Sequence, residues 1–168
     1  MEIVTSMTHQ NDTEQICCPR FEPDQWNDKI FDWSDKNFIK DKVASFFYLP
    51  LNFSNVMKRL NKLVDSSEAS SPDWLCLSEH VSKWKINIYL NVDKEISDAE
   101  NASLSGKYYC KVYEGPFSQT NSWIDDYKKS ALEKGMKTKK PLLWYTTCPK
   151  CAKKYGKNYV AIFSQIAD

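Results

Sequence analysis

The chain has 168 residues, the usual length of a single domain. Lysine and arginine together number 23, and aspartate and glutamate number 22, so the chain lacks the net charge that draws proteins to nucleic acid or anionic membranes. Nucleic-acid-binding and membrane-bound classes are therefore disfavoured, and the 14% content of aromatic residues instead favours a ring-lined site for a small molecule.

Residues 1–16 are polar and show no hydrophobic periodicity, so we expect a disordered tail. They contain no basic start followed by an apolar run, and no stretch of the chain reaches the roughly 20 apolar residues that span a bilayer. We therefore expect a cytoplasmic protein whose six cysteines are reduced thiols or metal ligands rather than disulfides.

Residues 17–168 form the expected single domain, and it begins with an irregular lead-in over 17–42 that is dense in Trp, Phe, Asp and Pro. A first unit over 43–92 follows. It contains a strand at 43–51, a helix in FSNVMKRLNKLVDS with apolar residues spaced by three and four, and a hairpin over 74–92. In the second run of the hairpin, Trp84, Ile86 and Ile88 alternate with polar residues, so we expect one side of that strand to face the core.

A polar connector over 93–105 precedes a second unit, 106–166, in which the order strand, helix, strand, strand recurs. GKYYCKVYEGPF predicts a strand, SQTNSWIDDYKKSALEKG a helix, and LLWYTT and YVAIFSQI the last two strands. The predicted fold class is α+β, with two tandem strand-helix-strand-strand units that form a pseudo-two-fold antiparallel-sheet domain with a cleft between them.

The second unit opens with G-x-Y-x-x-x-V-x-x-G-P-F, from Gly106 to Phe117, followed by a helix that carries a tryptophan. With the repeated order of elements, this motif resembles the gyrase-inhibitor-like (GyrI-like) small-molecule-binding domains over roughly residues 43–166. The whole chain, including CCPRFEPDQW and YTTCPKCAKKYGKNY, also resembles a group of small bacterial proteins commonly labelled hydrolases within that superfamily. The resemblance implies two quasi-symmetric units whose strands frame a cleft, and relatives that bind lipophilic cations or hydrolyse strained small molecules.

The resemblance also implies an acidic residue on a cleft strand, in a run like Leu-Glu-Ile-Tyr. The matching run here starts at Leu142 and retains the tyrosine as Tyr145, but Leu143 stands where the carboxylate would be. Because acid-base chemistry needs a group that exchanges a proton, a replacement carboxylate is expected elsewhere.

The candidate catalytic residues are Glu79 and Glu114, with Tyr145 or Tyr89 as a proton donor. Each glutamate is also explained as a solvated surface residue. His80 follows Glu79 directly, but neighbouring residues of a regular strand point to opposite faces, which argues against a dyad of the two.

A set of mostly aromatic side chains on predicted strands is expected to line the cleft, although core packing would also explain most of the rings. These candidate ligand-binding residues are Tyr48, Trp84, Asn87, Tyr89, Tyr109, Tyr113 and Trp144.

Cysteines provide the candidate metal site. Cys148 and Cys151 are separated by two residues, a spacing at which two thiolates bind one zinc ion. Cys17 and Cys18 would complete the site if the lead-in packs against the loop between the last two strands, and zinc would then act as a structural staple. The alternative is a reduced pair of thiols without metal. A redox pair is disfavoured because the motif falls in a predicted basic hairpin loop and not at the start of a helix.

The sequence thus predicts a protein that binds a small, mostly apolar or aromatic molecule, with hydrolysis of that molecule and the oligomeric state left open. The alternative is a non-catalytic structural or interaction protein with a zinc-stapled cysteine cluster.

Overall fold

The computed structural model describes residues 18, 20–47, 49–147 and 149–168. Its helices and strands in chain order are the 3-10 turn Pro23–Gln25, β1 (Lys29–Phe46), β2 (Leu49–Pro50), α1 (Phe53–Ser66), the 3-10 turn Pro72–Trp74, β3 (Cys76–Ser82), β4 (Lys85–Asn91), β5 (Glu100–Glu114), the 3-10 turn Phe117–Gln119, α2 (Thr120–Glu133), β6 (Leu142–Tyr145), α3 (Pro149–Tyr155) and β7 (Tyr159–Gln165).

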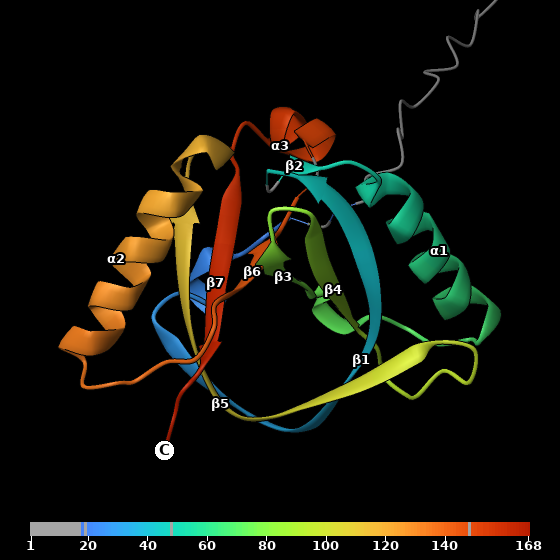
Figure 1. Ribbon diagram of the computed structural model, residues 1–168, viewed down its shortest axis with the longest axis horizontal. Coiled ribbons are helices and arrows are strands. Elements are labelled where there is room, and N and C mark those ends of the chain that lie inside the picture. Colours follow the sequence, from blue (N-terminus) through green and yellow to red (C-terminus); the bar gives the residue numbers. More distant parts are fainter. Residues whose placement is uncertain (1–17, 19, 48, 148) are drawn as a thin grey trace, which may run out of the picture.

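Six antiparallel strands form a closed sheet. The order is β1-β4-β3-β6-β7-β5, and β5 pairs again with β1, so the sheet closes into a barrel. The short strand β2 pairs with the end of β1. Helices α1 and α2 lie on opposite sides of the closed sheet, and α3 caps one end between β6 and β7 (Figure 1). The α+β class predicted from the sequence is confirmed.

Strand β1 is much longer than the sequence predicts, and the expectation of an irregular lead-in is wrong from Lys29 onwards. The reason is a bulge, since the register with β5 shifts between Trp33 and Lys36 and Asp35 has a left-handed φ of 46°. Trp33 and Phe38 are five residues apart and would face opposite sides of a regular strand, yet both are buried in the same cluster. The bulge therefore hides the period of two that reveals a strand.

Two further boundaries differ from the expectation. The connector over 93–105 is shorter because β5 already begins at Glu100, where it pairs with Lys40 of β1. The predicted loop around the last cysteine pair contains the helix α3. The hairpin of β3 and β4, by contrast, is confirmed, with Cys76 opposite Leu90.

The buried hydrophobic residues in the described part of the chain form three clusters. One fills the interior of the closed sheet with rings, and the other two lie between the sheet and a helix. Helix α1 buries Val56, Leu60 and Val64, and full burial of one such side chain stabilises the fold by about 1.5–3 kcal/mol. Helix α2 buries Trp123, Tyr127 and Ala131, as their spacing of four predicts.

The polar side of an amphipathic strand usually faces solvent, but the polar side of β4 is buried. Asn87 and Asn91 are buried on the interior face, while Ile86, Ile88 and Leu90 pack beneath α1. Both faces of this strand are therefore covered. Among the described residues, no helix is long and apolar enough to cross a membrane.

Candidate functional site

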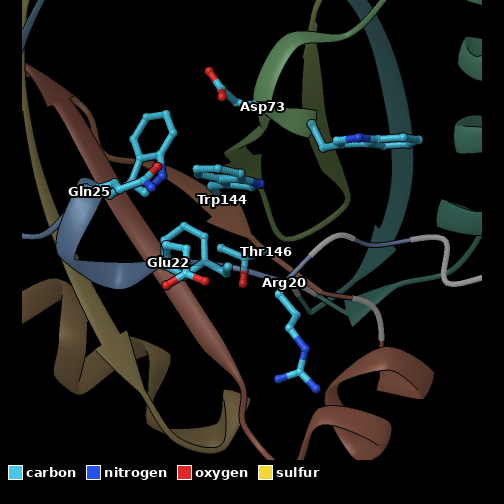
Figure 2. A pocket seen from close by; sticks show the side chains of 9 residues that line it. Arg20, Glu22, Gln25, Asp73, Trp144 and Thr146 are labelled. Carbon is cyan, nitrogen blue, oxygen red and sulfur yellow. The ribbon is translucent and has the colours of Figure 1, made fainter.

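A cleft of about 220 Å³ opens beside Trp144, near the end of β6. Three separate segments form it, namely the lead-in before β1, the turn before β3 and the end of β6 (Figure 2). Its lining residues are Arg20, Phe21, Glu22, Gln25, Trp26, Asp73, Trp74, Trp144 and Thr146.

Aromatic rings form the floor and walls of the cleft. Trp144 is only 4% exposed and belongs to the interior cluster. Phe21 and Trp26 of the lead-in meet it edge to face, with ring centroids 5.2 Å and 4.9 Å away. Edge-to-face geometry is the favoured arrangement of aromatic pairs. The lead-in therefore seals this part of the interior with its own rings and leaves a shallow, ring-lined hollow.

The turn before β3 holds an exposed ring at the cleft. Asp73 and Trp74 have φ angles of 57° and 55°, in the left-handed region. Such backbone costs a non-glycine residue free energy and is concentrated at functional sites. Trp74 remains 54% exposed although it lines the cleft. The strained turn thus presents an indole that the core does not use.

The polar groups at the cleft are mostly acidic or already engaged. The Arg20 side chain points away from Trp144 towards α3 (Figure 2), and its guanidinium lies 4.8 Å from the Tyr155 ring centroid. The Thr146 hydroxyl donates to the Tyr159 carbonyl at 2.8 Å. Glu22 and Asp73 contribute carboxylates beside the rings. The ring faces favour a flat or positively charged ligand, and the carboxylates favour positive charge.

The structure places Glu79 on the interior face of β3, outside the residues that line this cleft. Asn87 donates a hydrogen bond to the Glu79 carboxylate at 3.0 Å. Burial raises the pKa of Tyr89, and the charge of Glu79 raises it further. Of the predicted site residues, Glu79, Asn87 and Tyr89 are therefore neighbours.

Tyr145 faces the other way. Its hydroxyl lies 3.2 Å from Nε2 of His80, and its ring packs edge to face on Phe117. Burial raises the pKa of Tyr145 to about 12, so the phenol stays protonated at neutral pH. Glu79 and His80 therefore contact different partners, Asn87 and Tyr145, as expected for neighbouring residues on opposite faces of β3.

Glu114 is exposed at the end of β5 and lines a second, shallower hollow of about 390 Å³ with Lys153 and Lys157. The three candidate catalytic residues thus lie in three different surroundings, and the structure does not assemble them into one site. Sequence periodicity assigned each residue to a strand, but it could not tell which faces of different strands meet.

The predicted ligand-binding rings are dispersed in the same way. Tyr109 and Tyr113 pack beneath α2, and Trp84 is exposed at the β3–β4 turn. Tyr48 lies outside the described residues. Among the described members of the predicted set, only Trp144 lines the cleft. Phe21, Trp26 and Trp74 line the cleft but were not predicted as site residues. The density of rings in the lead-in was a signal for Phe21 and Trp26, whereas Trp74 was predicted as the first residue of the hairpin.

The candidate metal ligands are partly described. The hydroxyl of Tyr155, on α3, donates to the carbonyl of Cys18 at 2.6 Å, so the lead-in packs against the helix that carries Cys151. Cys151 is 4% exposed. Cys17 and Cys148 lie outside the described residues. No group of three metal-binding side chains occurs within the part of the chain that the structure describes.

Comparison with known proteins shows which family the chain belongs to. No curated protein matches the chain. A solved hydrolase from Listeria innocua is 12% identical, with a TM-score of 0.56 over 83% of this chain and 91% of that one. SAV2435, solved bound to tetraphenylphosphonium, is 11% identical, with a TM-score of 0.51 over 83% of this chain and 93% of that one. At these identities the likeness concerns the fold alone. A family model described as bacterial hydrolase matches residues 8–166, which include every helix and strand of the fold, so the chain belongs to the bacterial hydrolase family.

Proposed function

We propose that this protein binds a small aromatic molecule, one or two rings of which enter the cleft beside Trp144. The observation that carries the proposal is the exposed Trp74, which a strained turn holds at a hollow already walled by Phe21 and Trp26. An exposed ring at a concave, ring-lined surface is a common element of small-molecule sites.

The size of the cleft limits the ligand. A cavity of about 150 Å³ accommodates benzene, so the 220 Å³ here fits one or two fused rings, with the rest of a larger molecule outside. Glu22 and Asp73 favour a positive charge on that ligand. A fold neighbour solved with tetraphenylphosphonium supports a lipophilic cation as the first probe.

We further propose that the chain is a gyrase-inhibitor-like domain built from two related halves. The strand-helix-strand-strand order of β1, α1, β3 and β4 recurs in β5, α2, β6 and β7, which supports this proposal. The three strands of each half are also neighbours in the closed sheet. Both halves contribute to the cleft, since Trp74 comes from the first and Trp144 from the second.

Binding is tested with two ions of the same shape and opposite charge. Tetraphenylphosphonium should quench tryptophan fluorescence and bind more tightly than tetraphenylborate. Trp74→Ala should weaken binding by about threefold to tenfold, the worth of one aromatic contact. Trp84→Ala is the matched control, because this ring is similarly exposed but lies outside the cleft. Equal affinities of the two variants would remove the cleft from consideration.

Hydrolysis of the ligand would need a base in the same cleft, and Glu22 and Asp73 are its two carboxylates. Either could accept a proton from the water that attacks an electrophilic carbon. Turnover of 1-naphthyl acetate that is lost in Glu22→Gln or in Asp73→Asn would support an enzyme and would identify the base. Binding without turnover would support sequestration alone.

We also propose the second function, a zinc ion that fixes the lead-in to α3. The contact of Tyr155 with the Cys18 carbonyl supports it, because it brings the lead-in to the helix of Cys151. Four thiolates from Cys17, Cys18, Cys148 and Cys151 would give the tetrahedral set of a structural zinc site. The same lead-in supplies Phe21 and Trp26, so zinc would also hold a wall of the cleft.

Metal analysis of the purified protein decides the zinc proposal. We expect about one zinc ion per chain and its loss in Cys18→Ser and Cys151→Ser. Cys76→Ser is the control, because Cys76 lies on β3 beside Met57. Protein that folds and binds ligand without zinc would contradict this proposal and leave the cleft standing.

A further inference from the structure

An exposed aromatic surface lies away from the cleft. Of the ten large hydrophobic side chains that are exposed in the described part of the chain, six fall in two short segments, 46–53 and 81–84. Three rings form its centre. Phe46 and Phe47 are each 53% exposed and Trp84 is 57% exposed, and their centroids lie 4.8–5.6 Å apart. We call Phe46, Phe47 and Trp84 the aromatic tip. A cluster of this kind marks an interaction site more often than chance exposure.

The aromatic tip is held in place by the fold. Ser45 is buried, its N–H donates to the Trp84 carbonyl at 2.9 Å, and its hydroxyl donates to the Lys83 carbonyl at 2.8 Å. These bonds join the end of β1 to the β3–β4 turn. Phe47 has a left-handed φ of 46°, a backbone state that is unfavourable for a bulky residue. The two hydrogen bonds of Ser45 therefore fix the position of the turn that carries Trp84 relative to the end of β1.

Basic side chains outnumber acidic ones in the two segments that carry these rings. Residues 42–64 contain four basic side chains and residues 81–92 contain two, and neither segment has an aspartate or glutamate. The Lys83 ammonium lies 5.4 Å from the Phe47 ring centroid. Arg59 is balanced by Asp41 at 2.7 Å, which leaves five lysines. The net charge of +1 for the whole chain conceals this local excess.

We propose that the aromatic tip docks on an anionic lipid surface, with the three rings at the headgroup level and Lys83 and Lys85 on the phosphates. Trp is enriched at the membrane interface, Phe inserts at the boundary between headgroups and acyl chains, and nearby lysines are attracted to anionic lipids. A second copy of the chain is a poorer occupant, because it would bring the same lysines face to face. The sequence-based expectation of no membrane partner rested on net charge, which does not report how charges are distributed.

Co-sedimentation with vesicles tests the proposal. The protein should pellet with phosphatidylcholine vesicles that contain about 30% phosphatidylglycerol, remain in solution with pure phosphatidylcholine, and dissociate as salt is raised. Each lysine near such a surface contributes about fivefold to partitioning, so Lys83→Glu with Lys85→Glu should weaken binding at least about 25-fold. The control is Lys128→Glu with Lys139→Glu, which makes the same change in net charge elsewhere and should weaken vesicle binding by less than about twofold.

Phe47→Gly separates binding from folding. Glycine adopts the left-handed backbone freely, so the melting temperature should stay the same or rise while vesicle binding falls. Failure of the wild-type protein to pellet with anionic vesicles would overturn the proposal. Concentration-dependent self-association that Trp84→Ser abolishes would also overturn it, because the occupant would then be a second copy of the chain. Binding to polyglutamate but not to vesicles would overturn it in favour of an acidic protein segment. None of these outcomes depends on the ligand cleft.

Discussion

Trp26→Ala tests whether the lead-in is an essential part of the core. The Trp26 ring contacts Phe31, Trp144 and Phe163, with centroids 5.1, 4.9 and 6.1 Å away. Each aromatic pair contributes about 0.5–1.5 kcal/mol, so the three together give roughly 3 kcal/mol. Changes of a buried Trp to Ala cost about 3–5 kcal/mol. The value expected for Trp26 lies at the lower end of this range because its ring is half-buried.

Urea denaturation followed by circular dichroism measures the loss. With a slope of about 2 kcal/mol per molar urea, the midpoint should fall by about 1.5 M. Trp84→Ala is the control, since that ring is 57% exposed, packs on the exposed rings of Phe46 and Phe47, and should cost under about 1 kcal/mol. If both variants lost the same stability, the lead-in would not be packed as described, and the wall it gives to the cleft would be doubtful.

Three further changes probe other parts of the fold. Burial lowers the pKa of His80 below its ordinary 6.5. The contribution of neutral His80 to the free energy of unfolding should therefore be complete above pH 6.5 and be lost as the pH drops below that value. His80→Asn should flatten the slope of melting temperature against pH. Leu60→Ala, at a side chain 1% exposed, should cost about 2–5 kcal/mol in urea denaturation, whereas Leu132→Ala, 68% exposed, should change stability by less than about 0.5 kcal/mol. Gly106→Ala should cost about 1–3 kcal/mol by the same assay, because φ is +114° and the new Cβ would lie 2.7 Å from Nε2 of Gln165; unchanged stability would mean that Gln165 moves aside and the strain is absorbed.

The parts of the fold that local patterns determine were predictable. Leu60 and its helical neighbours recur at spacings of three and four, and the helix follows from one amphipathic face. The hairpin of β3 and β4 follows from two runs separated by a tight turn. Strand β1 was missed because the bulge after Trp33 breaks the alternation and moves Phe38 to the same side.

The candidate site was less accessible to such reasoning, because it depends on which distant segments meet. Phe21, Trp74 and Trp144 come from a lead-in, a turn and a strand end. No local period links them, and only the closure of the sheet brings them together. Glu79 and Tyr145 illustrate the reverse case, since neighbouring strands place them on opposite faces. The period of two gives the relative facing within one strand but leaves open which face is inside.

Closure of the sheet also sets the order in which the chain can fold. The seam of β1 with β5 pairs Lys29 with Cys110, and the seam of β3 with β6 pairs Leu77 with Trp144. Contacts so remote in sequence slow folding, because a long loop must be ordered before they form. During synthesis, one edge of β1 and one edge of β3 remain unpaired until β5 and β6 have been made. This interval is when the nascent chain is most exposed to aggregation and most dependent on chaperones.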